Sequence, residues 1–283
     1  MREVVTPRRD LLREAGSALR LAGIAAPERE ARWLAEAVWG VESAELLGDE
    51  RLLGPGQTDR YRNAVARRLR GEPLAYVTGQ AAFRHLMLRS DRRALIPRPE
   101  TEGLVDLALR RVPGGRALDI GTGTGAIALS LAAEGGYQTV VATDRSPDAI
   151  ALARENRSLT GLHMELVLDD LGSSLRPASF DVLVSNPPYL SAAEGATLDR
   201  SVRDWEPAEA LVSGSDGLAA TRRLLGEGNR LLRPGGWIVI ELECSRAGRT
   251  AELASAHGWL DVAVLDDLFN RARYLVARRS KSL

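Results

Sequence analysis

The chemistry in this sequence centres on four consecutive residues, Asn186-Pro187-Pro188-Tyr189, which follow the apolar run 180–185. Asn186 carries a side-chain carbonyl oxygen, and Pro187 carries a backbone carbonyl in a segment whose φ is fixed and whose N–H is absent. Two acceptors held in this way can bind both hydrogens of an NH₂ group and turn the nitrogen lone pair toward an electrophile. Tyr189 adds a flat ring against which a planar substrate can lie. The four residues therefore predict chemistry on a planar amide or exocyclic nitrogen.

The same four residues are also compatible with a simple turn, because Asn-Pro pairs favour turn initiation. A glycine-rich loop upstream favours the chemical interpretation. The run 116–120 is typical of a buried strand, and 126–132 is typical of a helix. Between them lie Gly121, Thr122, Gly123, Thr124 and Gly125. This strand, glycine turn and helix predict a dinucleotide or nucleoside site, because glycines allow close backbone approach and the helix N-terminus offers free N–H groups.

Acidic residues at the ends of the next predicted strands are candidates for contacts with such a ligand. Asp144 lies about twenty residues after the glycine loop, where a ribose diol is usually held, although it could also be a helix N-cap or a solvated charge. Asp170 and Leu171 end the following strand, where an acid and an apolar side chain can bracket an adenine ring. One of Asp169 and Asp170 is expected to be only solvated. Asp119, beside the glycines, is suited to fix the loop or to meet an amino group.

These residues need a scaffold that brings several strand ends together, and the sequence predicts one. Strands are expected at 139–144, 166–170, 180–185 and 237–242, and they alternate with helices expected at 146–156 and 217–232. Such alternation predicts a mostly parallel sheet that is covered on both faces. Two further strands are expected at 262–265 and 273–277, and a helix at 100–111.

The first part of the chain has a different pattern. Between Thr6 and Arg70, apolar residues recur at spacings of three and four, which predicts a small helical domain over residues 1–72. Shorter apolar runs around Gly79 and Ser90 predict a β-hairpin connector over 73–98. Residues 99–283 then form the expected catalytic domain.

Composition narrows the class of protein. Hydrophobic residues at 45% and charged residues at 27% are ordinary for a soluble globular protein, and 283 residues leave room for two domains. The single cysteine, Cys244, excludes an intramolecular disulfide and fits a reducing compartment. The three histidines are scattered without metal-ligand spacing, so we expect no metal. Because neither a signal-peptide pattern nor a long apolar run is visible, we expect a cytoplasmic protein with no membrane partner.

Four blocks of this sequence resemble the PrmC/HemK methyltransferases, which methylate a glutamine side chain of peptide chain release factors. The blocks lie within residues 67–279 and are Gly71–Gly79 with Leu95–Glu102, Asp119–Ala126, Ala142–Ala149, and Ser185–Tyr189 with Glu206-Pro207. The pairing of Pro-Arg-Pro-Glu-Thr-Glu with Asn-Pro-Pro-Tyr is specific, whereas many methyltransferases share the glycine loop.

The resemblance implies an α/β fold of the class I S-adenosylmethionine-dependent methyltransferases, Rossmann-like, with a mostly parallel seven-stranded sheet and a helical N-terminal domain that helps recognise the protein substrate. It implies that Gly121 to Gly125, Asp144 and Leu171 meet the cofactor and that Asn186 to Tyr189 hold the glutamine amide. Together with Asp119, Asp170 and Asn186, these residues make up the expected cofactor site. Glu100 and Glu102 could shape the substrate pocket or simply begin a helix. The expected partner is a release factor, and we expect a monomer without stable nucleic-acid binding.

Two departures from the family pattern and three alternatives stay open at this point. After the strand at 237–242 the family tends to have a glycine and later a glutamine, where this chain has Glu243-Cys244-Ser245, and a glycine is common near Asn270. Asn-Pro-Pro-Tyr is also used on adenine amino groups of nucleic acids and on small metabolites. The arginine-rich stretch 60–98 could face phosphate, or it could be an ordinary solvated surface. The third alternative is a protein that binds the cofactor without catalysis, and such a protein would not need the two acceptors of Asn186 and Pro187 that can hold an NH₂ group.

Overall fold

The structure is a computed structural model that describes residues 5–46 and 51–281. Two compact units make it up. The first contains the described residues up to Gln80 together with Arg200–Trp205, and the second contains Ala81–Asp199 and the described chain from Glu206 onward. Residues 1–4 and 47–50 of the helical domain expected over 1–72, and the last two residues of the chain, lie outside the described residues.

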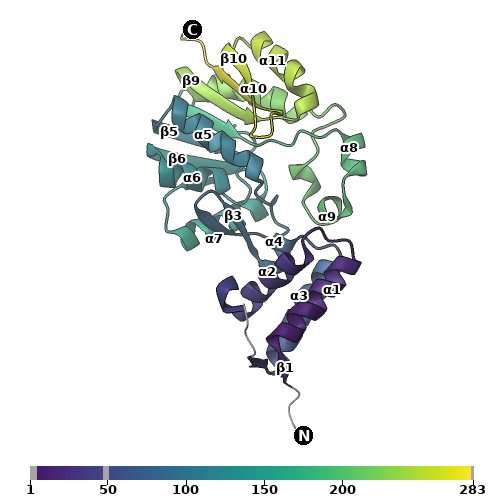
Figure 1. Cartoon of the computed structure of the whole chain (residues 1–283). Helices are drawn as coiled ribbons and strands as arrows, with labels where there is room; N and C mark the ends of the chain where they lie inside the picture. Colours follow the sequence, from purple (N-terminus) through teal and green to yellow (C-terminus); the bar gives the residue numbers. More distant parts are fainter. Residues whose placement is uncertain (1–4, 47–50, 282–283) are drawn as a thin grey trace. The chain divides into compact units, whose positions relative to one another are not determined.

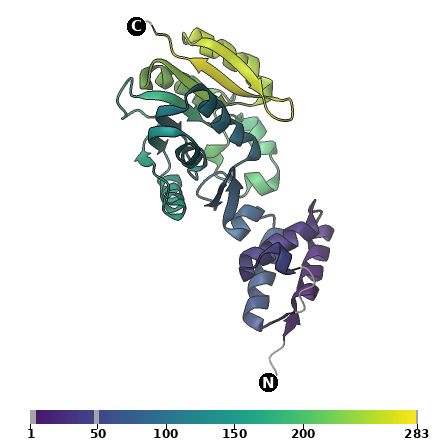
Figure 2. The ribbon, with the colours of Figure 1, turned by 60° about the vertical axis from the view of Figure 1, so that its left-hand side comes forward.

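The first unit is built from helices, as the spacing of its apolar residues predicts (Figure 2). Its elements are α1 (Arg8–Leu21), α2 (Pro27–Trp39), the 3-10 turn η1 (Ser43–Leu46), α3 (Pro55–Leu69) and α4 (Leu74–Thr78), with a short sheet of β1 (Thr6–Pro7) and β2 (Leu52–Leu53). Leu11, Leu19, Leu34 and Tyr61 are almost completely buried and pack together. The Tyr61 hydroxyl also donates to the Ala31 carbonyl at 2.9 Å. The first unit therefore has an apolar core of its own.

The hairpin expected over residues 73–98 is shorter than predicted. Residues 74–78 form α4, which begins after Pro73 and ends at Gly79, whose φ of +75° is the left-handed conformation that glycine favours at helix ends. Only β3 (Gln80–Phe83) and β4 (Leu86–Arg89) form the hairpin. The prediction was wrong at 74–78 because a run of five residues is too short to separate a helical period from a strand.

The second unit is built around a β-sheet (Figure 1). The sheet has seven strands in the order β10-β11-β9-β8-β5-β6-β7. Its strands are β5 (Gly114–Ile120), β6 (Gly136–Asp144), β7 (Glu165–Leu168), β8 (Phe180–Ser185), β9 (Leu232–Glu241), β10 (Leu260–Asp266) and β11 (Ala272–Arg278). Neighbouring strands from β9 to β7 pair in parallel, whereas β11 is antiparallel to both β9 and β10. The expectation of a mostly parallel, seven-stranded sheet is thereby confirmed.

Helices cover both faces of this sheet, because successive residues of a strand point to opposite faces. On β5, Ala117 belongs to an apolar core with α5 (Glu102–Arg111), α6 (Ala126–Glu134) and α7 (Pro147–Thr160). Leu118, the next residue, belongs to a second core with α10 (Ala219–Leu231) and α11 (Ala247–Ala256). The remaining short elements of this unit are η2 (Pro99–Thr101), α8 (Ala192–Thr197), η3 (Ala208–Ala210) and η4 (Cys244–Arg246), whereas α9 (Arg200–Arg203) belongs to the first unit. Within the described residues, no helix has the length and apolar character needed to cross a bilayer.

The parallel strands bring their carboxyl ends to one edge of the sheet. There β5 ends at Ile120, β6 at Asp144 and β8 at Ser185. The strand order changes direction at β5, since β6 lies on one side of it and β8 on the other. Ligand sites of open α/β sheets lie at such a switch point, so this edge is where a site is expected.

Candidate active site

A pocket opens at this edge of the sheet and brings most of the predicted residues together. The predicted residues that line it are Gly121, Thr122, Gly123, Thr124, Asp144, Asp170, Leu171, Asn186, Pro187 and Pro188. Further walls come from residues 93–98, Thr101, Ser146, Pro207 and Arg223. The wall that the described residues form does not include five predicted residues, namely Asp119, Gly125, Tyr189, Glu100 and Glu102.

The glycine loop between β5 and α6 is shaped by backbone conformations that suit glycine. Gly121, Gly123 and Gly125 have φ values of +75°, +55° and +86°. The N–H groups of Gly121 and Thr122 both donate to the Thr143 carbonyl at 2.9 Å, which fixes the loop against β6. A Cβ atom added at Gly121 would meet nothing within 4 Å, so this part of the loop faces open space. At Gly125 the same atom would lie 3.0 Å from a buried methionine side chain, so Gly125 serves packing.

Asp119 supports the glycine loop from inside the protein. It is fully buried, and its Oδ2 accepts a hydrogen bond from the Thr122 hydroxyl at 2.7 Å. Burial raises the pKa of Asp119 to about 7, against the opposing effect of the hydrogen bond from Thr122. Its Oδ1 makes no hydrogen bond of ordinary geometry to any described residue. Asp119 therefore fixes the loop through Thr122, and the Ala128 N–H also interacts with its carboxylate.

Asp144 stands at the end of β6 with its carboxylate held by the backbone. Its Oδ1 accepts from the Ser146 N–H and its Oδ2 from the Gly123 N–H, both at 2.9 Å. Burial raises the pKa of Asp144, and the two backbone hydrogen bonds oppose this rise. The N-cap of α7 is Ser146, whose hydroxyl accepts from the Ala149 N–H. Asp144 is therefore not the cap, and its remaining lone pairs are available on the pocket side.

The two aspartates after β7 have different roles. Asp169 is buried and accepts from the N–H groups of Ser173 and Ser174, both at 2.8 Å, so it folds the loop on itself. Asp170 is exposed and pairs with Arg223 of α10 at 2.6 Å. The sequence predicts that one of these two acids is only a solvated charge. Asp170 fits this prediction because it is exposed, and it also forms an ion pair with Arg223.

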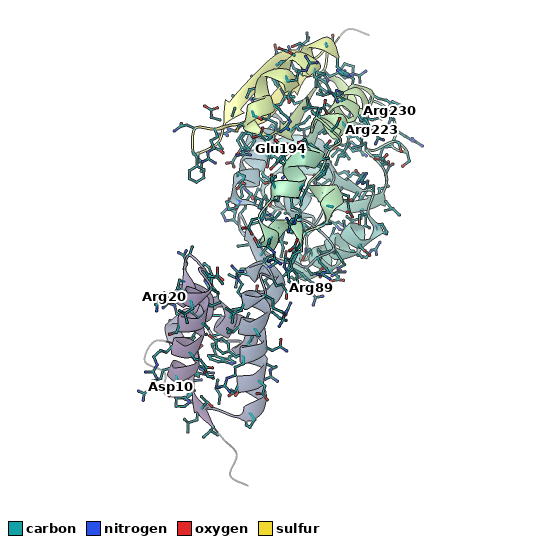
Figure 3. All side chains as sticks on the ribbon, turned by 90° about the vertical axis from the view of Figure 1, so that its right-hand side faces the viewer. Asp10, Arg20, Arg89, Glu194, Arg223 and Arg230 are labelled. Carbon is teal, nitrogen blue, oxygen red and sulfur yellow. The ribbon has the colours of Figure 1, made fainter. Side chains whose placement is uncertain are left out.

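Leu171 lies in the pocket wall with its backbone in the unfavourable left-handed conformation. Its φ is +58°, a value that residues with a side chain adopt rarely. Arg230 fixes the loop beyond it by donating to the carbonyls of Gly172 and Leu175, both at 2.7 Å. Figure 3 labels Arg223 and Arg230, the two α10 arginines that hold this loop. Such strain is characteristic of functional sites, which supports the prediction for Leu171.

Asn186 follows β8 directly and presents its amide at the pocket wall. The end of β8 is tied to β5, because the Ser185 hydroxyl donates to the Ile120 carbonyl at 2.7 Å. Asn186 Nδ2 donates to Thr101 Oγ1 at 3.1 Å. In the part of the chain that the structure describes, its side chain makes no second hydrogen bond, so its Oδ1 is a free acceptor. Pro187 and Pro188 continue the wall.

Thr101 and Glu241 are two site residues that the sequence interpretation missed. Thr101 lies in the pocket wall, is 5% exposed and donates to Glu241 Oε2 at 2.7 Å. Glu241, at the end of β9, is 1% exposed and also accepts from the Tyr189 hydroxyl at 3.3 Å. The Tyr189 hydroxyl therefore binds Glu241 behind the pocket wall and does not line the pocket. Burial raises the pKa of Tyr189, and the charge of Glu241 raises it further. The available signal was the Pro-Arg-Pro-Glu-Thr-Glu block, in which the threonine matters as much as the acids.

Glu100 and Glu102 occupy structural positions at the start of α5. Glu102 Oε1 accepts from the Arg84 N–H at 2.8 Å, which anchors the turn of the β3–β4 hairpin. The Glu100 carbonyl accepts from the Tyr274 hydroxyl at 2.6 Å. Neither side chain lines the pocket of the described chain, so the helix-start interpretation describes their placement better.

Glu206 is a second buried acid that shapes the pocket. Its side chain is 1% exposed and accepts from Arg98 Nη2 at 2.5 Å and from the Ile96 N–H at 3.0 Å. Both Ile96 and Arg98 belong to the pocket wall. Glu206 of the Glu206-Pro207 block therefore holds the loop at 93–98 in place, although the two segments are far apart in the sequence.

The two departures from the family pattern are accommodated by the backbone. Asn270 has a φ of +57°, the left-handed region in which glycine is favoured and asparagine is tolerated. Glu243 has an ordinary extended conformation, with φ −82° and ψ 133°, and needs no glycine. Its carboxylate accepts from the Ser245 N–H at 2.7 Å and begins the short turn η4. Neither departure alters the pocket wall.

Comparison with known proteins agrees with this geometry. The family described as "PrmC N-terminal domain" matches residues 10–79, and the family described as "Methyltransferase small domain" matches residues 101–203. Among solved structures, a methyltransferase from Pyrococcus furiosus has a TM-score of 0.54 at 21% identity, covering 77% of this chain and 98% of its own. The 16S rRNA N2 G1207 methyltransferase of T. thermophilus, in complex with AdoMet and guanosine, has a TM-score of 0.50 at 19% identity, covering 71% and 49%. These two likenesses show the fold.

Similarity in sequence goes further than the fold. The "Release factor glutamine methyltransferase" of Deinococcus radiodurans is 44% identical over 276 residues, which cover 96% of this chain and 98% of that protein. The protein of the same name from Cereibacter sphaeroides is 40% identical over 274 residues, covering 95% and 97%. Likeness at this level spans both the helical unit and the sheet unit. The chain therefore belongs to the family of release factor glutamine methyltransferases.

Proposed function

We propose that this protein transfers a methyl group from S-adenosylmethionine to the side-chain amide nitrogen of a glutamine in a peptide chain release factor. The observation that carries the proposal is the amide of Asn186. Thr101 accepts from its nitrogen, so its oxygen is the group left for a ligand in the pocket. Pro187 and Pro188 have no N–H, so the backbone of this wall offers acceptors only. A wall of acceptors fits an NH₂ group, which carries two donors.

The opposite side of the pocket fits S-adenosylmethionine. The open space at Gly121 leaves room for the ligand beside the N–H groups that begin α6, which suit its carboxylate. Asp144 has acceptor sites for the ribose hydroxyls, and Leu171 is an apolar surface for the adenine. When bound, S-adenosylmethionine supplies a methyl group on a positively charged sulfur, which is the electrophile.

The protein's own residues act on the acceptor nitrogen. An amide nitrogen is a weak nucleophile because its lone pair is delocalised into the carbonyl. The Asn186 oxygen and the Pro187 carbonyl hold the two N–H bonds and stabilise the positive charge that develops on the nitrogen. No general base is required, because the alkylated nitrogen is acidic enough to lose a proton to water.

Asp144→Ala is expected to weaken S-adenosylmethionine binding much more than Asp170→Ala. Loss of a charged hydrogen-bond partner costs about 1.5–3 kcal/mol, which corresponds to about 10- to 100-fold in Kd. Asp170 instead forms an exposed pair with Arg223, and such pairs contribute little. Isothermal titration calorimetry of both variants measures the difference. Equal affinities would remove Asp144 from the ribose contact.

The proposed substrate is tested by offering several acceptors to the purified protein with radiolabelled S-adenosylmethionine. The expected result is label in a release factor and none in DNA or in small amides. Label in DNA alone would overturn the proposed substrate and favour an adenine amino group. Label in no acceptor, with cofactor binding intact, would favour a non-catalytic cofactor-binding protein.

Transfer to nucleic acid is the second candidate, and the structure gives it less support. Many of the arginines that suggested a phosphate-binding surface form ion pairs with acids inside their own units. Ion pairs join Arg67 to Glu72, Arg68 to Glu30, Arg84 to Glu134, Arg93 to Asp91 and Glu155, and Arg98 to Glu206. A guanidinium held by a carboxylate is a poor ligand for phosphate, because the acid repels the incoming anion.

We also propose that the helical unit over the first part of the chain takes part in recognising the release factor. On α2 Trp33 is 40% exposed, and the centroid of its ring lies 5.1 Å from the Arg29 guanidinium carbon. Exposed tryptophan and arginine are the residue types that contribute most at protein interfaces. In the labelling assay, Trp33→Ala should raise KM for the release factor and leave kcat unchanged. Leu159→Ala, a change at an exposed leucine of α7, is the control and should alter neither constant.

A further inference from the structure

Four polar side chains from three segments form one hydrogen-bonded chain that begins in the pocket wall and continues into the protein. Asn186 donates to Thr101, Thr101 donates to Glu241, and Tyr189 donates to the other oxygen of Glu241. Thr101 and Glu241 are both nearly inaccessible, so bulk water cannot substitute for either partner. Asn186 is therefore connected to a buried carboxylate through a single hydroxyl group.

The charge on Glu241 sets the direction of every hydrogen bond in this chain. An ionised carboxylate only accepts, so Thr101 and Tyr189 must both point their hydrogens at it. Thr101 has one hydroxyl hydrogen, and once Glu241 accepts it, the Thr101 oxygen can only accept from Asn186. Asn186 must then turn its NH₂ group toward Thr101. Because the amide is planar, its oxygen points away from Thr101.

We propose that Thr101 and Glu241 are positioning residues for methyl transfer, which fix the Asn186 amide so that its oxygen, and not its nitrogen, is presented to the substrate. The inference rests on the proposed function, because it takes the substrate to be an NH₂ group. If the Asn186 amide were turned over, its N–H donors would face the N–H donors of the substrate. The clamp would then repel the group that it should hold.

The placement of Glu241 is costly for a group with a purely structural role. Burial raises its pKa to about 7, while the hydrogen bond from Thr101 and the charge of Arg273 lower it and the charge of Glu100 raises it. Tyr189 donates to it, and Tyr274 lies opposite it across the β9–β11 pair. A leucine at this position would avoid the cost of a buried charge. An acceptor for the Thr101 hydrogen is the property that a leucine cannot supply.

Protonation of Glu241 should release this control. A neutral carboxyl group can donate to the Thr101 oxygen, and the Thr101 hydrogen is then free to meet the Asn186 oxygen. Because the pKa of Glu241 is raised to about 7, kcat should fall as the pH is lowered through about 7. Burial also raises the pKa of Asp119 to about 7, so the wild-type profile alone does not identify the group. Glu241→Gln distinguishes the contribution of Glu241 from that of Asp119. The glutamine cannot ionise, so the part of the fall in kcat at low pH that Glu241 causes should be absent in this variant.

The first test compares three threonine variants in the full chain with a release factor as substrate. Thr101→Val keeps the shape and removes the hydroxyl, and should lower kcat on the order of 100-fold through misplacement of Asn186. Its affinity for S-adenosylmethionine should stay close to that of the wild type. Thr101→Ser keeps the hydroxyl and should restore most of kcat. Thr250→Val removes another buried hydroxyl, which donates to the Arg246 carbonyl at 3.0 Å, and should leave kcat unchanged.

The second test needs no substrate and does not require Thr101→Val to fold. In isotope-labelled protein, NMR of the Asn186 side-chain NH₂, assigned by its absence in Asn186→Ala, should show a shift with a midpoint near pH 7. The shift should be absent in Glu241→Gln. A wild-type Asn186 resonance that does not respond to pH in this range, or one that responds equally in Glu241→Gln, overturns the inference.

The kinetic results can also contradict the inference. A wild-type kcat in Thr101→Val would show that the hydroxyl is not needed, and a Thr101→Ser variant as slow as Thr101→Val would show that the methyl group matters instead. Failure of the wild type to methylate any release factor would overturn the proposed function, and the NMR titration would still decide the orientation of Asn186.

Discussion

Asn186→Ala is expected to lower kcat by about 100-fold or more while S-adenosylmethionine binds with nearly wild-type affinity. The substitution removes the free acceptor of the pocket wall, so the substrate nitrogen is no longer oriented. The fold should tolerate the change, because Thr101 still donates to Glu241 and the Ser185 hydroxyl still ties β8 to β5. The proposed cofactor contacts lie mainly on the glycine loop and Asp144, which the substitution does not touch.

Single-turnover rates and calorimetry on the same preparation measure both parts of this expectation. The control is Asn229→Ala, because Asn229 donates to the His257 carbonyl at 2.8 Å, away from the pocket. Its rate should equal that of the wild type. Transfer by Asn186→Ala at an appreciable fraction of the wild-type rate would exclude Asn186 as the amide clamp.

Gly217→Ala is expected to damage both stability and activity, because Gly217 packs directly under the site. Its φ is +75°, and an added Cβ would lie 2.4 Å from the Tyr189 carbonyl oxygen and 2.8 Å from Arg246 Nε. The carbonyl belongs to the backbone, so it cannot move aside as a flexible side chain would. The left-handed conformation costs about 1–2 kcal/mol and overpacking adds about 1–3 kcal/mol. Displacement of Tyr189 should also disturb the hydrogen bond to Glu241.

Gly161→Ala is the matched control for Gly217→Ala. Gly161 ends α7 with a φ of +68°, and a Cβ there would meet nothing within 4 Å. Its substitution should therefore cost only the conformational part, about 1–2 kcal/mol, and leave kcat unchanged. Urea unfolding and kcat of the two variants give the comparison. Equal effects would show that the contact between Gly217 and the Tyr189 carbonyl has no role.

Much of the fold could be predicted because its signals are local. The strand expected at 180–185 is β8, Phe180–Ser185, whose apolar run is buried as a central parallel strand requires. The glycine loop could be recognised because three of its residues need conformations that suit glycine. The position of Asn186 in the pocket wall could be predicted because it directly follows the end of β8, where sites of parallel sheets lie.

The remaining site residues depend on contacts between distant parts of the chain. Thr101 and Glu241 lie 140 positions apart, and no spacing rule connects them. Glu100, Thr101 and Glu102 are consecutive, yet only Thr101 reaches the pocket wall, because the turn from η2 into α5 points the three side chains in different directions. Asp169 and Asp170 could not be distinguished from the sequence, because only the fold shows that Ser173 and Ser174 satisfy Asp169 and that Arg223 pairs with Asp170.

The measurement that tests the central claim most directly is the location of the transferred methyl group. A release factor incubated with the enzyme and S-adenosylmethionine should be digested and its fragment ions used to place the added mass. The acceptor clamp at Asn186 predicts a methyl group on the side-chain nitrogen of one glutamine, and none when Asn186→Ala replaces the wild type. A methyl group on an oxygen, on a carbon or on a lysine amine would contradict the account.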